Sequence, residues 1–294
     1  ILFGWNNFMK LQCADRTLDL STPRVMGVLN TTPDSFSDGG QFVHVDQALR
    51  HAESMVSEGA AIIDVGGEST RPGAERVSLD EELDRVIPVV EKISLNLDVC
   101  ISVDSSSPEV MVEAKQAGAH ILNDVRALTR SGSLVAAVES GLPVCIMHMQ
   151  GEPDTMQTDP NYSQVVQDVF GYLQQRIQTC TEAGIPKDQL LVDPGFGFGK
   201  TLAHNYKLLA QLDAFSKLGV PLLIGLSRKS MIGGALADKE GRPRAVEHRV
   251  AGSVAGAVVA AMNGAHIIRV HDVKECKRVV EVVDAVRSIK VQNS

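Results

Sequence analysis

Aromatic residues, paired cysteines and long apolar runs are all scarce in this sequence of 294 residues. Aromatic side chains make up only 4% of the chain, so its core has to be built from Val, Ile, Leu, Ala and Met. Buried parallel strands typically read as such aliphatic runs. No apolar stretch approaches the ~20 residues that a membrane-spanning helix needs, so we expect no membrane partner.

Cysteine pairs and an excess of positive charge are missing as well. The five cysteines are scattered and form no CxxC pair, and Cys100 and Cys145 lie inside apolar runs. We therefore expect buried free thiols in a reducing compartment, hence a cytoplasmic protein with neither disulfides nor a zinc site. The formal net charge is −8, whereas a general nucleic-acid binder usually carries a basic surface, so no nucleic-acid partner is expected.

The N-terminal residues carry no recognisable targeting signal. Residues 1–8 are too few and lack the basic start of a signal peptide. Met9-Lys10 resembles a natural start, so we expect residues 1–8 to be upstream sequence within a tail over residues 1–14. Residues 15–294 are expected to form one domain, since no linker or low-complexity tract interrupts them.

Eight short aliphatic runs alternate with amphipathic segments along the chain. Each run is too short for a helix, whereas Asp46–Glu58, Leu79–Ile93, Tyr162–Glu182 and Arg249–Asn263 have helical spacing. Strands that alternate with helices pair in parallel through right-handed crossovers, and eight such units predict an α/β fold, a single-domain (β/α)8 TIM barrel. The predicted strands are Val25–Asn30, Ala61–Gly67, Val99–Asp104, His120–Val125, Pro143–Met149, Leu190–Gly195, Pro221–Ser227 and Ile267–His271.

The competing architecture is a doubly wound open sheet. Its dinucleotide-binding version carries G-x-G-x-x-G after the first strand. Here residues 30–40 (NTTPDSFSDGG) follow the first predicted strand instead, which favours the barrel.

Almost every aliphatic run ends in a polar residue. A single polar residue at a strand end often only begins a turn or caps a helix, and a structural role is at least as good an interpretation of His148 as ligand binding. Eight such residues in register, however, would meet at the carboxyl-terminal mouth of a barrel, where barrel enzymes place their catalytic groups. They are Asn30, Asp64, Asp104, Asn123, His148, Asp193, Ser227 and His271.

Three loops at this mouth have unusual compositions. Residues 30–40 and 66–74 (GGESTRPGA) are rich in Gly, Ser, Thr and Pro, as are many surface loops, but beside a polar mouth their backbone donors could cover an anion. Residues 195–201 (GFGFGKT) imitate a P-loop, yet the first Gly of that motif falls on Pro194. We interpret this third loop as letting the backbone and Phe198 approach a flat ligand, with Lys200 as a solvated or capping lysine.

The last two predicted strands supply positive charge. Residues 227–230 (SRKS) open a helix, where free backbone N–H groups and two cations would meet. Arg269 and His271 are two residues apart, which puts both side chains on one face of the last strand. A lone Lys or Arg usually faces solvent. Clustered after strands 7 and 8, a frequent phosphate site in barrels, these residues predict an anion site.

Together these motifs resemble the dihydropteroate synthases of the folate pathway. The resemblance covers essentially Lys10 to about Ser288. It implies a transferase that joins 6-hydroxymethyl-7,8-dihydropterin diphosphate to p-aminobenzoate and releases diphosphate, with Mg²⁺ as cofactor. It rests on the segments NTTPDSFSDGG, DVGGESTRPG, DPGFGFGK, SRKSMIG and RVHDV and on Asp104 and Asn123-Asp124.

The resemblance also implies a pterin site. A pterin presents N–H donors beside a carbonyl acceptor, and a carboxylate can bind two such donors at once while a Lys or an amide serves the acceptor. Asp64 would contact the pterin or support the floor of its site. The residues that would line this site are Asp64, Asp104, Asn123, Asp193 and Lys229, and Met147 and Gly225 are further expected substrate-binding residues.

For the diphosphate, the resemblance implies Asn30, Thr70, Arg71, Arg269 and His271, with Asn30 a direct Mg²⁺ ligand. Mg²⁺ usually keeps several waters and bridges phosphate oxygens, which suits so few protein ligands. Diphosphate would leave in a loose, SN1-like substitution at an exocyclic methylene, so no protein nucleophile is needed. The catalytic residues would be Asp38, which faces the developing cation, with Lys229, Arg269 and His271.

For p-aminobenzoate, the resemblance implies Phe36, Thr70, Pro72, Phe198 and Ser227. Phe36 and Pro72 match the drug-sensitive pattern, so sulfonamides are expected to inhibit. Thr31 stands where Val is usual and residues 105–107 (SSS) replace a Thr-containing run, which affects loop packing rather than activity.

Several alternatives stay open at the level of sequence. A catalytically silent pterin-binding barrel would lose the loops or the diphosphate cations, and a pterin-dependent methyltransferase would lack the first loop and SRKS. A Schiff-base aldolase could use Lys229. The family suggests a homodimer through the late helices, and the apolar segment Val250–Met262 is compatible with that.

Overall fold

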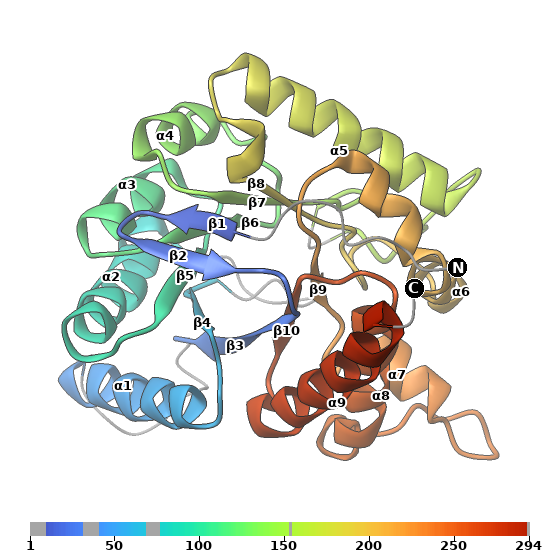
Figure 1. Cartoon of the computed structure of the whole chain (residues 1–294). Coiled ribbons are helices and arrows are strands. Elements are labelled where there is room, and N and C mark those ends of the chain that lie inside the picture. The colour runs from blue at the N-terminus through green and yellow to red at the C-terminus, as the bar shows by residue number, and fades with distance from the viewer. Residues whose placement is uncertain (1–9, 32–40, 69–76, 153–154, 293–294) are drawn as a thin grey trace.

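The computed structural model describes residues 10–31, 41–68, 77–152 and 155–292, in which eight parallel strands form a barrel (Figure 1). The sheet order is β8-β7-β6-β5-β4-β3-β10-β9, and a parallel bridge between Val192 and Leu222 joins its two edges. The predicted TIM barrel is thereby confirmed, with strand bounds within two residues of those expected. The strands are β3 (Arg24–Asn30), β4 (Ile62–Gly66), β5 (Cys100–Asp104), β6 (Ile121–Asp124), β7 (Val144–Met147), β8 (Leu190–Asp193), β9 (Leu223–Gly225) and β10 (Ile267–Val270).

Helices surround the strands, and each packs an apolar stripe against them (Figure 1). In α2, for example, Ser78 and Glu81 form a reciprocal capping box, and Val86, Val90 and Ile93 face the barrel. No helix of the described residues is long and apolar enough to span a membrane. The helices are α1 (Gln41–Ser57), α2 (Leu79–Asn96), α3 (Pro108–Gln116), α4 (Ser133–Ser140), α5 (Val165–Glu182), α6 (Leu202–Ala210), α7 (Ser230–Ala235), α8 (Val250–Met262) and α9 (Val273–Gln292).

Each strand sends one apolar side chain into the bottom of the barrel, and together these eight residues form what we call the lower layer. Aliphatic and thiol side chains fill the bottom completely, so the barrel is a packed core and not a pore. All five cysteines of the chain are buried free thiols, as expected. The lower layer consists of Met26, Ile62, Cys100, Ile121, Cys145, Leu191, Leu223 and Ile267.

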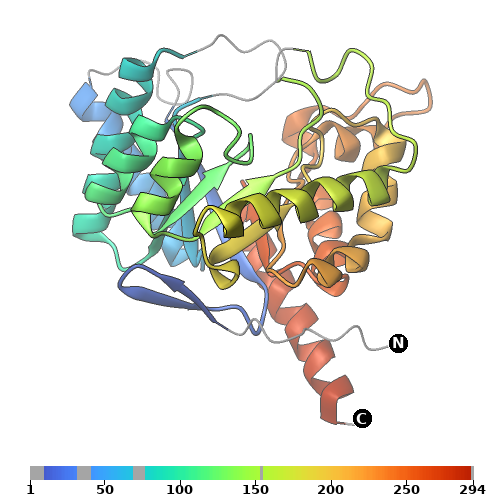
Figure 2. The same cartoon turned by 90° about the horizontal axis from the view of Figure 1, so that it is seen from above.

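An N-terminal hairpin closes the barrel from below (Figure 2). Its strands are β1 (Lys10–Cys13) and β2 (Arg16–Asp19), and Leu11, Cys13 and Leu20 pack against the lower layer. The prediction of a tail through residue 14 is therefore wrong for Lys10–Cys13, because their alternating side chains cover apolar surface that the barrel would otherwise expose.

A buried histidine joins the entries of two adjacent strands. His266 is 8% exposed, and its Nδ1 accepts a hydrogen bond from the Leu222 amide at 3.0 Å. Burial, with a smaller contribution from Arg287, lowers the pKa of His266 to about 4. The ring therefore stays neutral in the folded protein under conditions that protonate it in the unfolded chain.

This histidine should make the fold sensitive to acid. Between pH 6.5 and about 4 the unfolded chain binds a proton that folded His266 does not, so the free energy of unfolding should fall by up to ~1.4 kcal/mol per pH unit from this residue. Urea unfolding at several pH values should show a shallower acid dependence in His266→Asn than in the wild type. The exposed His51→Asn should keep the wild-type slope, and equal slopes in all three proteins would contradict the prediction.

Candidate active site

The side chains above the lower layer change from apolar to mainly polar. Because side chains alternate along a strand, the residue two positions after each member of the lower layer also points into the barrel. Six of these eight residues were predicted as site residues, and the two that were missed, Val28 and Ser102, follow from the same spacing. This upper layer consists of Val28, Asp64, Ser102, Asn123, Met147, Asp193, Gly225 and Arg269.

Arg269 lies at the centre of the upper layer, between two carboxylates. Its Nε donates to Asp64 Oδ2 at 2.6 Å, and a terminal nitrogen donates to Asp104 Oδ2 at 2.8 Å. Burial raises the pKa of Asp104 to about 7, against the lowering effect of Arg269. Burial also works against the charge of Arg269, but Asp64 and Asp104 more than compensate and raise its pKa. The guanidinium is therefore held as a fixed cation inside the barrel.

Two buried oxygens of the upper layer lack a partner among the described residues. Asp64 is fully buried, and Oδ2 accepts from Asn123 Nδ2 at 3.2 Å, but Oδ1 accepts no hydrogen bond there. Ser102, the neighbour of Asp64 in β5, likewise has an unpartnered Oγ. Since buried polar groups are almost always hydrogen-bonded, these atoms mark a place where a polar ligand or water belongs.

Asp193 and Lys229 are two further buried charges of opposite sign, and each acts on the pKa of the other without a direct ion pair between these two described residues. Burial raises the pKa of Asp193 against Lys229, and burial lowers the pKa of Lys229 to about 8 against Asp193. Lys229 Nζ donates to the Phe196 carbonyl at 2.6 Å and lies 4.5 Å from the centre of the Phe198 ring. Gly225 lies between Asp193 and Arg269. A Cβ at this position would be in ordinary van der Waals contact with both side chains, at 3.8–3.9 Å, so glycine leaves this space open.

Lys200 is not the solvated or capping lysine that was expected. It is 3% exposed, and Nζ donates to the carbonyls of Gly195 at 2.8 Å and Phe198 at 3.0 Å and contacts His148 Nδ1 at 3.0 Å. Burial lowers the pKa of Lys200 to about 7. Burial and then Lys200 lower the pKa of His148 to about 3, so this histidine is neutral and structural.

The cations after β9 are only partly available to an anion. Arg228 pairs with Asp272, its Nε 3.0 Å from Oδ2, so the two cations expected at residues 227–230 do not both face the mouth. The helix that begins there, α7, spans six residues. His271 follows the end of β10, and its Nδ1 lies 3.1 Å from Ser227 Oγ.

An ion pair that the sequence did not predict borders the site. Arg126, which follows β6, binds Glu68 through two hydrogen bonds of 3.0 and 3.1 Å, and both side chains are largely buried. Glu152 lies 3.7 Å from the same guanidinium. No local sequence pattern could have signalled this pair, because its members come from loops after different strands.

Several predicted residues cannot be placed. Phe36, Asp38, Thr70, Arg71 and Pro72 all lie outside the described residues. The predicted metal ligand Asn30 is described: it ends β3 at the mouth of the barrel and is half-buried. Among the described residues, no group of three or more His, Cys, Asp or Glu side chains is arranged to hold a metal ion.

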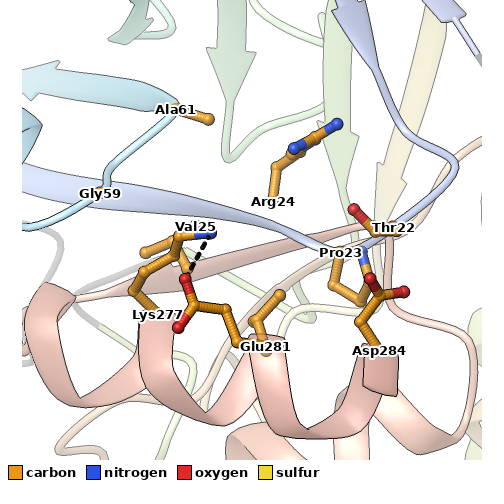
Figure 3. A pocket seen from close by; sticks show the side chains of 10 residues that line it. Thr22, Pro23, Arg24, Val25, Gly59, Ala61, Lys277, Glu281 and Asp284 are labelled. Carbon is orange, nitrogen blue, oxygen red and sulfur yellow. Dashed lines mark ion pairs between the residues drawn. The ribbon is translucent and has the colours of Figure 1, made fainter. Parts of the chain in front are cut away.

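A small cavity of about 70 Å³ lies away from these groups, where β3 begins and α9 passes (Figure 3). Thr22, Pro23 and Arg24 line it together with Lys277 of α9, whose Nζ lies 3.2 Å from Glu281 Oε1. Because enzymes of this fold place their chemistry at the opposite, carboxyl-terminal end of the strands, the upper layer is the candidate site.

Comparison with known proteins identifies the family of the chain. The family model described as "Pterin binding enzyme" matches residues 26–271. The dihydropteroate synthase of Escherichia coli K12 is 56% identical over 282 residues, which cover 96% of this chain and 98% of that protein.

Solved structures agree as well. A Yersinia pestis dihydropteroate synthase in complex with a sulfonamide drug has a TM-score of 0.89 and 55% identity, covering 95% of this chain and 100% of that one. A Xanthomonas albilineans dihydropteroate synthase with 4-aminobenzoic acid has a TM-score of 0.88 and 48% identity, covering 95% and 98%. The chain therefore belongs to the dihydropteroate synthase family of pterin-binding enzymes.

Proposed function

We propose that this chain condenses 6-hydroxymethyl-7,8-dihydropterin diphosphate with p-aminobenzoate to give 7,8-dihydropteroate and diphosphate, with the upper layer as its pterin site. The observation that carries the proposal is the concentration of buried carboxylates and cations in and directly above that layer. Asp64, Asp104 and Asp193 lie in one water-poor space with Arg269 and Lys229. Buried charges need partners, and although Arg269 is paired, Asp64 Oδ1 and Ser102 Oγ have none among the described residues, which suits a ligand with a complementary pattern.

The pterin ring supplies that pattern. Its N–H donors suit the carboxylates of Asp104 and Asp193, and its carbonyl suits the ammonium of Lys229 or the amide of Asn123. Gly225 and Met147 give the flat ring room and an apolar surface. Asp64 supports the site by holding Arg269 and Asn123, and Oδ1 remains for the ligand or an ordered water.

In the reaction, the bond between the exocyclic methylene and the diphosphate oxygen breaks, and the aryl amine of p-aminobenzoate forms the new C–N bond and loses a proton. Arg269 and His271, with Thr70 and Arg71, would stabilise the departing diphosphate, and Asp38 would stabilise the cationic methylene. Preorganised charges act most strongly where water is excluded. Arg269 is preorganised in this sense, because hydrogen bonds to Asp64 and Asp104 fix its position.

An Mg²⁺ ion fits the mouth through a single protein ligand. Asn30 offers a hard amide oxygen at the end of β3, and the other ligands would be diphosphate oxygens and water, as is usual for Mg²⁺. When bound, the ion would neutralise charge on the diphosphate.

The p-aminobenzoate would lie nearer the solvent. Phe198 is half-buried, Ser227 Oγ lies beside His271, and Phe36, Thr70 and Pro72 would complete this side of the site. The carboxylate of p-aminobenzoate would bind at the start of α7. The helix α7 spans only six residues and so contributes a small dipole, and Arg228 already pairs with Asp272. Most of this contact would therefore come from Ser227 and from the backbone N–H groups.

We further propose a cytoplasmic location and a homodimer. Five buried free thiols suit a reducing compartment. Val282, Val286 and Ile289 lie on one face of α9 and are exposed by 64%, 45% and 63%, and Val259 and Met262 are exposed on the adjacent α8. A second copy of the chain would bury these apolar side chains.

Product formation tests the proposed reaction. With Mg²⁺ present, diphosphate release from the pterin diphosphate should rise when p-aminobenzoate is added. Lys229→Ala and Arg269→Lys should lower kcat/KM on the order of 100-fold, since each removes a charged contact in a dry site. Lys239→Ala, in an exposed loop, is the matched control. Pterin binding without turnover would instead indicate a catalytically silent pterin-binding barrel.

Sulfonamides should compete with p-aminobenzoate. Steady-state rates at several p-aminobenzoate concentrations should show an increase in its KM with sulfonamide and an unchanged kcat, because both molecules present an aryl amine and a polar group at opposite ends of a ring. Non-competitive inhibition, or none, would argue against the proposed p-aminobenzoate site.

The homodimer can be tested by sedimentation. The wild type should sediment as a dimer, and Val282→Asp combined with Val286→Asp should shift it towards monomer, because buried carboxylates oppose association. Val135→Asp is a matched control, since Val135 is 60% exposed on α4. A wild-type monomer at micromolar concentration would contradict this proposal.

A further inference from the structure

The loop between β8 and α6 is held in place by side chains of the protein. From Gly195 to Lys200, every backbone carbonyl accepts a hydrogen bond from a side chain, although carbonyls in a loop of this kind would ordinarily face water. The donors, in the order of the carbonyls, are Lys200 to Gly195, Lys229 to Phe196, Gln157 to Gly197, Lys200 to Phe198, Tyr162 to Gly199 and Asn205 to Lys200.

Lys200 is the only described side chain that serves two of these carbonyls. Its ammonium has three protons and three close acceptors, the Gly195 carbonyl at 2.8 Å, the Phe198 carbonyl at 3.0 Å and His148 Nδ1 at 3.0 Å. At 3% exposure it has little access to water, so the protein itself replaces its hydration. The three bonds draw the loop into a closed turn and attach it to the segment that follows β7.

Close backbone packing makes this attachment rigid. Gly195 and Gly199 have φ values of +71° and +61°, a region that favours glycine. A Cβ on Gly195 would lie 1.8 Å from the His148 carbonyl oxygen, and one on Gly199 would lie 2.4 Å from that of Gln150. The two loops therefore touch through their backbones, and Lys200 links them at this contact.

The fixed loop in turn determines where Lys229 lies. The Phe196 carbonyl accepts from Lys229 Nζ at 2.6 Å, and the Phe198 ring packs 4.5 Å from the same atom. Both groups belong to the segment that Lys200 closes. A displacement of this segment would move the ammonium of Lys229 away from the upper layer.

We propose that Lys200 is a positioning residue for the pterin site, acting through the loop on Lys229 and Phe198 without touching the substrate itself. The inference rests on the proposed role of Lys229 in pterin binding. A positioning role and a purely structural role of Lys200 predict different effects of losing this residue. Loss of Lys200 should displace binding groups in the folded enzyme, whereas a stabilising residue would only change the fraction of enzyme that is folded.

Lys200→Met tests this proposal because it keeps the length of the side chain and removes every hydrogen bond of Nζ, the three close ones and a longer one of 3.4 Å to the His148 carbonyl. The KM for the pterin diphosphate should rise at least about 10-fold, the value of one lost charged hydrogen bond, while kcat should change less than about 3-fold. Lys207→Met, on the exposed face of α6, should behave as the wild type. A folded Lys200→Met with an unchanged KM would overturn the proposal, whatever its kcat.

Two further variants make the result interpretable. Lys200→Gln keeps two N–H donors and cannot serve all three acceptors, so a rise in KM of about 3-fold or more is expected if Lys200→Met fails to fold, and an unchanged KM is the overturning result. In the double variant Lys200→Met/Lys229→Ala, the KM should rise much less than the product of the single effects, because both act on one contact. Independent, multiplicative effects would exclude action through Lys229.

Lys229→Ala separates this proposal from the proposed function. If Lys229→Ala raises the KM for the pterin diphosphate and Lys200→Met does not, only the role of Lys200 is wrong. If Lys229→Ala leaves the KM unchanged, the proposed pterin site itself is wrong.

Discussion

Alternation of side chains along eight closed strands is the constraint on which this site depends. The barrel fixes which residue of each strand points inwards, and the lower layer fills the bottom with apolar groups such as Met26 and Ile62. Two residues further along each strand, the same geometry leaves Asp64, Asn123 and Asp193 no other direction than the interior. A dihydropteroate synthase thus obtains a polar site directly above a dry core, without a separate binding domain.

Because these polar side chains all point into the barrel, positive and negative charges lie close together there and balance locally, although the protein as a whole is acidic. The chain has a net charge of −8, yet Arg269 and Lys229 are held inside the barrel by carboxylates. Asp64 and Asp104 keep Arg269 charged, and burial makes Lys229 and Asp104 easier to neutralise. A ligand that offers both N–H donors and a carbonyl would complement these buried charges, which is the basis of the selectivity proposed for this site.

In the loop after β8, two glycines and one lysine together fix the conformation of the backbone. Gly195 and Gly199 allow two loops to meet at backbone distance, and Lys200 satisfies the carbonyls that this contact turns away from water. In the proposed pterin site, groups held in this way would lose less binding energy to ordering.

The sequence by itself determined the eight strands and the polar residues at their ends, because alternation, glycine and turn signals act over a few neighbouring residues, and its motifs identified the family by resemblance. It predicted Asp64, Asn123 and Arg269 as site residues for the same reason. Only the tertiary structure decided which groups neutralise each other. Arg269 meets Asp64 across 205 residues of chain, and Lys200 meets His148 across 52. Burial of Lys200 depends on such distant partners, and local sequence carries no record of them.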